Sequence, residues 1–206
     1  MKRKPMLFKK IGNNYSCEKR TVALLGINRG AGVTYTGMLL SNYFGTERRI
    51  KTAFLECNDH RDFERLQASY EWNKEDGYSF SFDRVTYYKN VAPNDISGIL
   101  SEDYGCYILD FGTDFNFWKE EFMRCGTKII IGDRAVWNRY KAVEFLKLLE
   151  DIRGNGNWIY MIPCAGKRDL IRLSKETGKK FIKIPYEQDS ALLSEETVKL
   201  FLRLFG

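Results

Sequence analysis

A glycine-bearing loop at residues 28–32 is the stretch of this sequence best suited to bind an anion. Gly30 and Gly32 let the backbone bend tightly, so that successive N–H groups point inward. A helix that begins at Val33 would add the positive end of its dipole. The amides of Val33 and Thr34 would then complete a phosphate cradle, and the Thr34 hydroxyl would be placed to hold Mg²⁺.

The loop departs from the usual phosphate-loop pattern, G-x-x-x-x-G-K-[ST], at two positions. Ile27 stands where the first glycine belongs, with Gly26 one residue early, and Val33 stands where the lysine belongs. That lysine neutralises the β- and γ-phosphates of a nucleotide, which a valine cannot do. The sequence therefore predicts a nucleotide cradle without its main positive charge. The alternative is a glycine turn that serves the fold and binds nothing.

Polar side chains also follow two other predicted strands. Glu56 and Asn58 end the strand at residues 51–57, and Asp110 ends the strand at residues 106–111. Because ligands of parallel sheets bind beyond the carboxyl ends of the strands, we expect these side chains to lie near the loop. Asp110 is then either a Mg²⁺ ligand or a carboxylate that faces solvent. Glu56 is either a ligand or the partner of a nearby Arg or Lys.

Strands and helices alternate along the chain. This pattern predicts an α/β fold with a doubly wound, mostly parallel sheet and helices on both faces. The aromatic stretch at residues 78–88 is expected to add one or two edge strands that pack over the core. Strands are expected at residues 21–27, 51–57, 106–111, 128–131, 157–164 and 181–184. Helices are expected at residues 33–44, 62–72, 115–124, 135–152 and 167–176, from a cap at Asn94 or Asp95 to Leu100, and from a cap at Ser194 to Phe205.

The length of 206 residues predicts one domain, preceded by a basic leader. Residues 1–20 carry seven Lys or Arg and one Glu, so their net charge of +6 equals that of the whole chain. Such a leader is usually a solvated tail, and in some proteins it contacts nucleic acid, anionic lipid or an acidic partner. We therefore expect a leader at residues 1–20 and a single domain at residues 21–206.

Composition excludes several classes of protein. No apolar run spans a bilayer, and the N-terminus lacks the apolar core of a signal peptide, so a cytoplasmic location is expected. The five cysteines have no metal-ligand spacing and are expected to be reduced thiols, largely buried. His60 is the only histidine, which argues against a histidine-based metal site or catalytic triad.

The order of these motifs resembles that of the ParA/MinD family of P-loop ATPases, from residue 21 onward. NRGAGVTY falls without a gap on the family's loop, which reads roughly KGGxGKTT. The resemblance places Asn28 on the signature lysine, which reaches across a dimer, and Val33 on the second lysine. It places Thr34 on the Mg²⁺-binding threonine and Tyr35 on the residue after it.

Three other segments carry the same resemblance. YILDFGTD resembles the Walker B strand, with Asp110 as the carboxylate that holds Mg²⁺ through water. LECND resembles the second-strand DxD element, with Glu56 and Asn58 on its carboxylates, and IPYEQD resembles the segment that runs past the adenine. The resemblance implies nucleotide contacts from Asn28, Arg29, Gly30, Gly32, Val33, Thr34, Tyr35, Pro185 and Tyr186, and metal contacts from Thr34, Asp110, Asn58 and Glu56.

Loss of both lysines sets the functional expectation. Hydrolysis depends on electrostatic stabilisation of the transferred phosphoryl group, which here would come from Mg²⁺, backbone amides and Arg29. Fast turnover is therefore not expected. The resemblance implies a degenerate member, comparable to the pilus-assembly localisation proteins TadZ and CpaE. It would act as a localisation or scaffold factor with a protein partner, bind ATP or ADP with Mg²⁺ if it binds a cofactor, and dimerise across the nucleotide face.

Other functions stay open at this point. One is an active, Mg²⁺-dependent ATPase of the partitioning type, and another is a nucleic-acid-associated protein that uses the leader. A kinase-like or synthetase-like P-loop enzyme is disfavoured without the loop lysine. The last segment, VKLFLRLFG, resembles the membrane anchor at the end of MinD, but a helix that packs on the sheet is the preferred interpretation.

Overall fold

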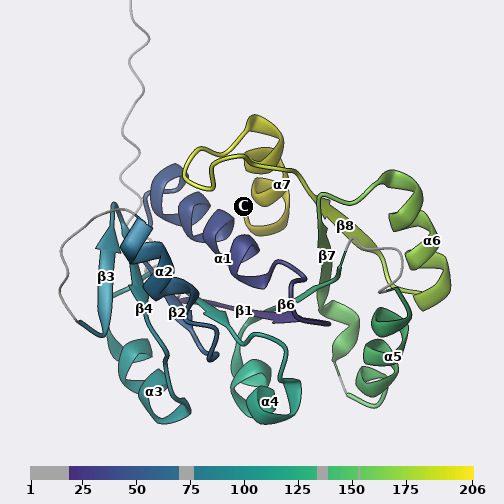
Figure 1. Ribbon diagram of the computed structural model, residues 1–206, viewed down its shortest axis with the longest axis horizontal. Helices are drawn as coiled ribbons and strands as arrows, with labels where there is room; N and C mark the ends of the chain where they lie inside the picture. Colours follow the sequence, from purple (N-terminus) through teal and green to yellow (C-terminus); the bar gives the residue numbers. More distant parts are fainter. Residues whose placement is uncertain (1–18, 70–76, 134–138, 153) are drawn as a thin grey trace, which may run out of the picture.

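A single sheet of eight strands organises the protein, as the computed structural model shows for residues 19–69, 77–133, 139–152 and 154–206 (Figure 1). The strands are β1 Arg20–Gly26, β2 Thr52–Glu56, β3 Ser79–Phe82, β4 Val85–Tyr88, β5 Cys106–Asp110, β6 Thr127–Ile131, β7 Ile159–Pro163 and β8 Phe181–Ile184. Their order is β3-β4-β2-β5-β1-β6-β7-β8, and only the β3–β4 pair is antiparallel. The predicted doubly wound α/β fold is confirmed.

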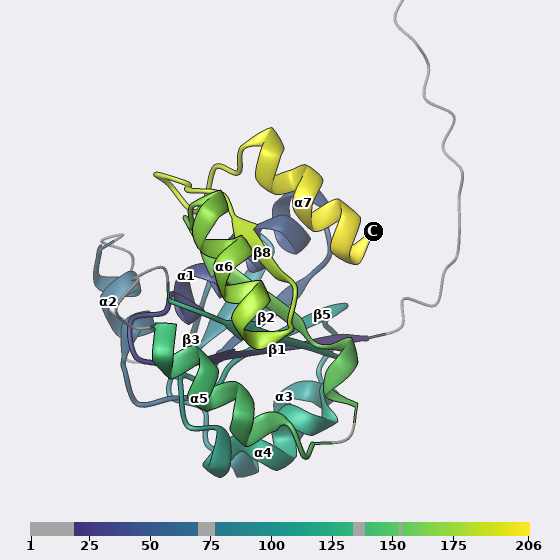
Figure 2. The ribbon, with the colours of Figure 1, turned by 90° about the vertical axis from the view of Figure 1, so that its right-hand side faces the viewer.

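Helices cover both faces of the sheet (Figures 1 and 2). They are α1 Val33–Asn42, continued by the π-helical turn η1 Tyr43–Glu47, then α2 Asp62–Ser69, α3 Pro93–Ser101, α4 Phe115–Arg124, α5 Arg139–Leu149, η3 Asn155–Asn157, α6 Lys167–Thr177 and α7 Glu195–Phe205. One apolar cluster joins the sheet to α1, η1, α2 and α7, and a second joins it to α3, α4, α5 and α6. The sheet is therefore buried on both sides.

Burial on both sides explains the continuous apolar runs of the central strands. In β1, Val22 and Leu24 belong to the cluster under α1, whereas Ala23 and Leu25 belong to the cluster on the opposite face. All four side chains are fully buried. A strand with two buried faces needs apolar residues at every position, which is why β1 reads as a run rather than as an alternation.

Some expected boundaries differ from the observed ones. The helix expected to be capped by Asn94 or Asp95 begins two or three residues earlier, at Pro93, with Ala92 at the cap position. Proline is favoured in a first turn because its missing N–H has no partner to lose there. Helix α5 ends at Leu149 rather than at residue 152. The expected helix start at residue 135 and the expected helix end at residue 72 lie outside the described residues.

The aromatic stretch forms two strands, β3 and β4. Of these two, β3 lies at the edge of the sheet and β4 lies inside it. Phe80 of β3 stacks on Tyr87 of β4, with ring centroids 4.9 Å apart. Tyr87 in turn lies against Phe54 and Phe63 of the core. The rings thus extend the core to the sheet edge, as expected.

The last helix, α7, is part of the core. Its cap Ser194 accepts a hydrogen bond from the backbone N–H of Thr197. Phe201 and Phe205 are buried against the rings of Tyr43 and Phe44 in η1, with centroids 5.5 and 5.6 Å apart. The preferred interpretation of the C-terminal segment is confirmed. In the part of the chain that the structure describes, no helix is both long and apolar enough to cross a bilayer.

Candidate nucleotide and magnesium site

The loop between β1 and α1 has the backbone conformation that its glycines allow. Gly30 and Gly32 have φ angles of 80° and 95°, in the left-handed region that disfavours side chains. The N–H of Thr36 bonds to the carbonyl of Gly32 at 2.9 Å, so the helix begins directly after the loop. A Cβ on Gly32 would lie 3.0 Å from Cγ of Pro163, whereas a Cβ on Gly30 would meet nothing within 4 Å. The loop is therefore open on the Gly30 side and closed against β7 on the other.

Thr34 and Asp110 are brought together at the start of α1. The Thr34 hydroxyl donates to Oδ2 of Asp110 at 2.7 Å, and the Gly112 amide donates to Oδ1 at 2.9 Å. Burial raises the pKa of Asp110, while the hydrogen bonds from Thr34 and Gly112 and the proximity of His60 act in the opposite direction. A fully buried carboxylate beside a hydroxyl offers the hard oxygen ligands that Mg²⁺ prefers.

Asp62, the first residue of α2, is a site residue that the sequence analysis missed. Its Oδ2 lies 3.4 Å from the Thr34 hydroxyl, and its Oδ1 accepts from Arg65 at 2.9 Å. The signal was present, because an acidic residue shortly after a strand end can turn back toward the sheet edge. The sequence analysis placed residue 62 only at the start of an expected helix.

Glu56 is held by backbone N–H groups, and its strand ends beside that of Asp110. Its Oε1 accepts from the backbone N–H groups of Asp62 at 2.6 Å and Phe63 at 3.2 Å, and its Oε2 accepts from that of Asn90 at 3.4 Å. Burial raises the pKa of Glu56, against the effect of these bonds. The carboxylate that the resemblance assigned to metal is thus used to hold the N-terminus of α2.

Asn58 shapes the turn that follows β2. Its Nδ2 donates to the carbonyl of Asp110 at 3.1 Å, and its Oδ1 accepts from the amide of His60 at 3.1 Å. Both ends of the side chain are therefore engaged with backbone. The expected contact of Asn58 with a metal stays a prediction, and it would use the second lone pair of Oδ1.

The two positions that the resemblance assigned to lysines carry no positive charge. The Asn28 amide donates to Oδ2 of Asp133, which follows β6, at 3.0 Å, and its Oδ1 is buried without a partner. Val33 is nearly buried, and its Cγ2 would lie 2.7 Å from a Cβ placed on Gly26. Gly26 is therefore required for close packing of the loop under α1. The side chains at residues 28 and 33 are both uncharged.

The segment after β8 is fastened to α1 and α7. The Tyr35 hydroxyl accepts from the amide of Glu187 at 2.8 Å, and the Glu187 carboxylate accepts from Ser194 and Thr197 at the start of α7. Pro185 is buried and Tyr186 is 69% exposed. Of the residues expected near the adenine, neither Pro185 nor Tyr186 is among the described residues that line the cavity beside the loop.

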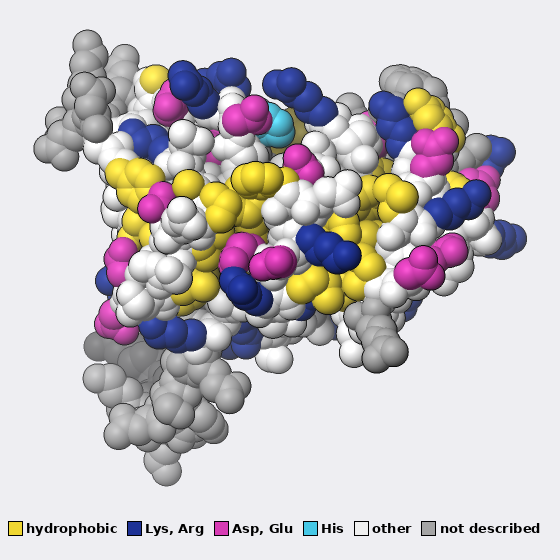
Figure 3. Space-filling view, turned by 90° about the horizontal axis from the view of Figure 1, so that it is seen from below, with side chains coloured by type: hydrophobic (Ala, Val, Ile, Leu, Met, Phe, Trp, Pro, Cys, Tyr) yellow, Lys and Arg dark blue, Asp and Glu magenta, His cyan; other side chains and the backbone are white. Residues whose placement is uncertain are grey.

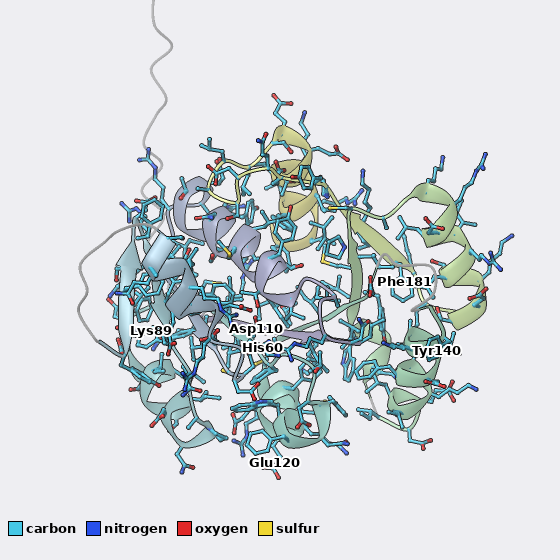
Figure 4. All side chains as sticks on the ribbon, in the orientation of Figure 1. His60, Lys89, Asp110, Glu120, Tyr140 and Phe181 are labelled. Carbon is cyan, nitrogen blue, oxygen red and sulfur yellow. The ribbon has the colours of Figure 1, made fainter. Side chains whose placement is uncertain are left out.

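A cavity of about 290 Å³ lies over the loop. It is lined by the described residues Asn28, Arg29, Gly30, Ala31, Gly32, Val33, Thr34, Tyr35, His60, Asp62, Arg65, Gly112 and Thr113. Three strand-end segments thus converge there, following β1, β2 and β5. Figure 4 shows His60 beside Asp110, and Figure 3 shows acidic and basic side chains gathered at the rim around the single histidine. Among the described residues, no cluster of three or more His, Cys, Asp or Glu is arranged to hold a metal by itself.

Glu187 gives a first testable prediction. Burial alone would raise the pKa of this carboxyl, but hydrogen bonds from Ser194 and Thr197 outweigh it and lower the pKa. A carboxyl with a lowered native pKa stabilises the fold above its unfolded pKa of about 4.3, and this contribution is lost as pH falls through the native value. We expect Glu187→Gln to lower the free energy of unfolding by about 1–3 kcal/mol near neutral pH, and by less in acid.

Urea denaturation at a series of pH values measures this difference. Glu195→Gln is the control, because the Glu195 side chain is 86% exposed and forms a surface ion pair with Lys199. It should change stability by less than about 0.5 kcal/mol at every pH. A constant gap between wild type and Glu187→Gln from neutral to acidic pH would contradict the assignment.

Solved structures with the same architecture come from bacteria and archaea. A plasmid partition protein of Borrelia burgdorferi B31, bound to AMPPNP, has a TM-score of 0.62 and 12% identity over 91% of this chain and 97% of its own. The ParA family ATPase of Chlorobium tepidum TLS has a TM-score of 0.61 and 17% identity over 88% and 92%. The septum site-determining protein MinD of Pyrococcus horikoshii OT3, complexed with Mg-ADP, has a TM-score of 0.60 and 10% identity over 91% and 96%. The chain has the fold of the ParA and MinD ATPases.

At these identities the likeness establishes the ParA/MinD fold and nothing finer. No protein-family model matches the chain, and no curated protein matches its sequence. The chain therefore combines a ParA/MinD architecture with a loop that holds Asn28 and Val33 at the two positions that the resemblance assigned to lysines.

Proposed function

We propose that this chain is a degenerate ParA/MinD-like protein that binds a Mg²⁺–nucleotide and hydrolyses it slowly or not at all. The observation that carries the proposal is the 2.7 Å hydrogen bond between Thr34 and the buried Asp110, directly beside a loop with two left-handed glycines. Nucleotides bound to proteins of this fold, AMPPNP and Mg-ADP, support it.

The residues present suit a Mg²⁺–nucleotide. Mg²⁺ keeps several waters and is commonly held by one or two protein groups together with substrate phosphates, so a full cluster of protein ligands is not needed. Thr34 and Asp110 would hold the ion, with Asp62 in the place expected for Glu56 and Asn58. The amides of residues 30–34 would hold phosphate oxygens. Bound Mg²⁺ would neutralise part of the phosphate charge.

Slow hydrolysis follows from the charges of the site. The transferred phosphoryl group carries negative charge on its equatorial oxygens, and the usual loop lysine stabilises that charge. Val33 packs against Gly26 and offers no charge. The loop thus keeps the geometry that binds phosphate and lacks the electrostatics that speed its transfer.

A localisation or scaffold role, as in TadZ and CpaE, is the part of the proposal that rests on the resemblance. The fold does not determine the function, so a localisation or scaffold role must be shown by identifying a protein partner. Figure 3 shows hydrophobic side chains exposed on the side of the molecule where Figure 1 places α3, α4 and α5. Exposed hydrophobic residues of these helices include Phe117 of α4, which is 65% exposed, and Leu148 of α5, which is 72% exposed. Exposed apolar groups of this kind often mark contact surfaces, which supports a protein partner. Dimerisation across the nucleotide face would be seen as a rise in mass with Mg²⁺–ATP.

Titration with ATP and ADP, with and without Mg²⁺, tests the proposed function. We expect binding by the wild type that strengthens with Mg²⁺, together with ATP turnover far below that of working ParA and MinD proteins. Turnover at their usual rate would show an active ATPase instead, and failure to bind any nucleotide would show a glycine turn that serves only the fold.

The metal assignment predicts the effect of Asp110→Asn. Asparagine keeps the size of the side chain and an oxygen for the Gly112 amide, but it removes the charge next to Mg²⁺. We expect Mg²⁺-dependent ATP binding to weaken about tenfold and Mg²⁺-free binding to stay unchanged. Asp59→Asn is the matched control, since Asp59 is exposed in the neighbouring turn. Equal effects of the two substitutions would refute the role of Asp110.

A nucleic-acid role through the leader is the second candidate function. Lys19 donates to the carbonyls of Leu100 and Glu102, and the Arg20 guanidinium donates to the carbonyl of Phe205 at 2.6 Å. These contacts lie at the amino end of β1, whereas the loop that lines the cavity follows its carboxyl end. Positive charge of the leader would therefore act on a nucleic acid independently of the nucleotide site.

Salt dependence distinguishes this second candidate. If the leader binds DNA, affinity should fall steeply as salt rises, because each phosphate contact releases counterions. Deletion of residues 1–18 keeps Lys19 and Arg20 and should abolish that binding, while nucleotide titration stays unchanged. DNA binding that survives the deletion, or wild type that binds no DNA, would eliminate the leader as a nucleic-acid contact.

A further inference from the structure

The cavity contains a cation that does not come from the loop. Of the described residues that line it, those able to carry positive charge are Arg29, His60 and Arg65. Arg29 lies in the loop and is exposed. Arg65 comes from the first turn of α2, the helix that follows β2, and its side chain is 72% exposed.

The position of Arg65 is tied to the core in two steps. Its Nη1 lies 2.9 Å from Oδ1 of Asp62, one helical turn earlier. The amide of Asp62 is bonded at 2.6 Å to the carboxylate of Glu56, which is only 1% exposed. Because Glu56 ends a central strand, the first turn of α2 is fixed relative to the sheet.

The same carboxylate links Arg65 to the phosphate loop. Oδ2 of Asp62 lies 3.4 Å from the Thr34 hydroxyl, so Asp62 stands between the guanidinium and the hydroxyl expected to hold Mg²⁺. Because Arg65 and the loop line the same cavity, the guanidinium would be available to the outer phosphate of a nucleotide held by the loop amides. Its planar fork suits two phosphate oxygens at once.

We propose that Arg65 binds the terminal phosphate of the nucleotide and supplies the positive charge that Val33 cannot. Asp62 positions Arg65 when no nucleotide is bound, and Glu56 positions Asp62. In this assignment the positive charge for the phosphates comes from α2, the helix after β2, and not from the phosphate loop. This assignment rests on the proposed function, since it requires that a nucleotide binds at the loop.

Calorimetric titration with ATP, ADP and adenosine in the presence of Mg²⁺ tests the assignment. We expect Arg65→Ala to weaken ATP binding about tenfold, ADP binding less, and adenosine binding not at all. Arg61→Ala is the matched control: Arg61 is exposed, lies four residues away, and is not among the described residues that line the cavity. It removes the same charge and should change ATP affinity by no more than about twofold.

A double substitution gives the sharper readout. If residue 65 and a lysine at residue 33 serve the same phosphates, their effects will not add. Arg65→Ala should then cost less in a Val33→Lys background than in the wild type. Equal costs in the two backgrounds, or equal effects of Arg65→Ala and Arg61→Ala, would overturn the assignment while leaving nucleotide binding intact. A wild type that binds no nucleotide would instead overturn the proposed function, and the role of Arg65 with it.

Discussion

Val33→Lys is expected to strengthen ATP binding ten- to a hundredfold, about what one charge-assisted hydrogen bond contributes. Val33 lines the cavity at the first turn of α1. It follows Gly32, which has a left-handed backbone, and precedes Thr34. A lysine there can leave the packing against Gly26 and extend along the loop toward the phosphates. The gain should be larger for ATP than for ADP, because the ammonium group serves the β- and γ-phosphates.

Val33→Met separates charge from length. Methionine is also unbranched and adapts to irregular space, but it brings no charge. It should leave nucleotide affinity close to that of the wild type. Both substitutions disturb the contact with Gly26 and should cost similar stability, so thermal unfolding of the two variants should agree. If Val33→Lys binds ATP no more tightly than Val33→Met, the cradle does not hold phosphates.

Gly37→Ala is expected to lower the free energy of unfolding by about 3 kcal/mol or more. A Cβ at this position of α1 would lie 2.1 Å from Cζ and 2.6 Å from Cε2 of the Phe54 ring. Phe54 is fully buried in β2 and packs on Phe63 and Tyr87, with ring centroids 4.7 and 5.9 Å away. The ring has no space to move into, so α1 would have to lift from the sheet. Alanine's better helix propensity, about 1 kcal/mol, does not offset this.

Gly98→Ala in α3 is the control for helix propensity. Gly98 also lies inside a helix, but a Cβ there would meet nothing within 4 Å. This substitution should raise stability by about 0.5–1 kcal/mol. Denaturant titration of both variants measures the difference. If Gly37→Ala is as stable as Gly98→Ala, the close approach of α1 to β2 is not present in solution.

Gly37 also connects stability with the site. Helix α1 carries Thr34 on its first turn, and its distance from the sheet sets how closely Thr34 approaches Asp110. A small residue at position 37 lets the helix lie directly on the ring of Phe54. We therefore expect Gly37→Ala to weaken Mg²⁺-dependent nucleotide binding as well.

Much of the fold was determined by local pattern. Runs of apolar residues predicted the buried strands, since a sheet covered on both faces needs them at every position. The rule that parallel strands end at one edge predicted the meeting of Thr34 and Asp110, and the structure confirms it at 2.7 Å. These inferences succeed because they depend only on periodicity and strand direction, both of which the sequence records.

The roles of Glu56 and Asp62 were decided by tertiary structure. Both are carboxylates in the segment after β2, and the resemblance assigned the metal to Glu56. The turn between them, with Arg61 at a φ of 56°, reverses the chain so that Asp62 faces Thr34 and Glu56 caps α2. No periodicity describes such a turn, because its direction depends on which backbone groups the core leaves unpaired. The sequence alone therefore determined the fold and the meeting of Thr34 with Asp110, and only the packed structure decided which side chains face the cavity.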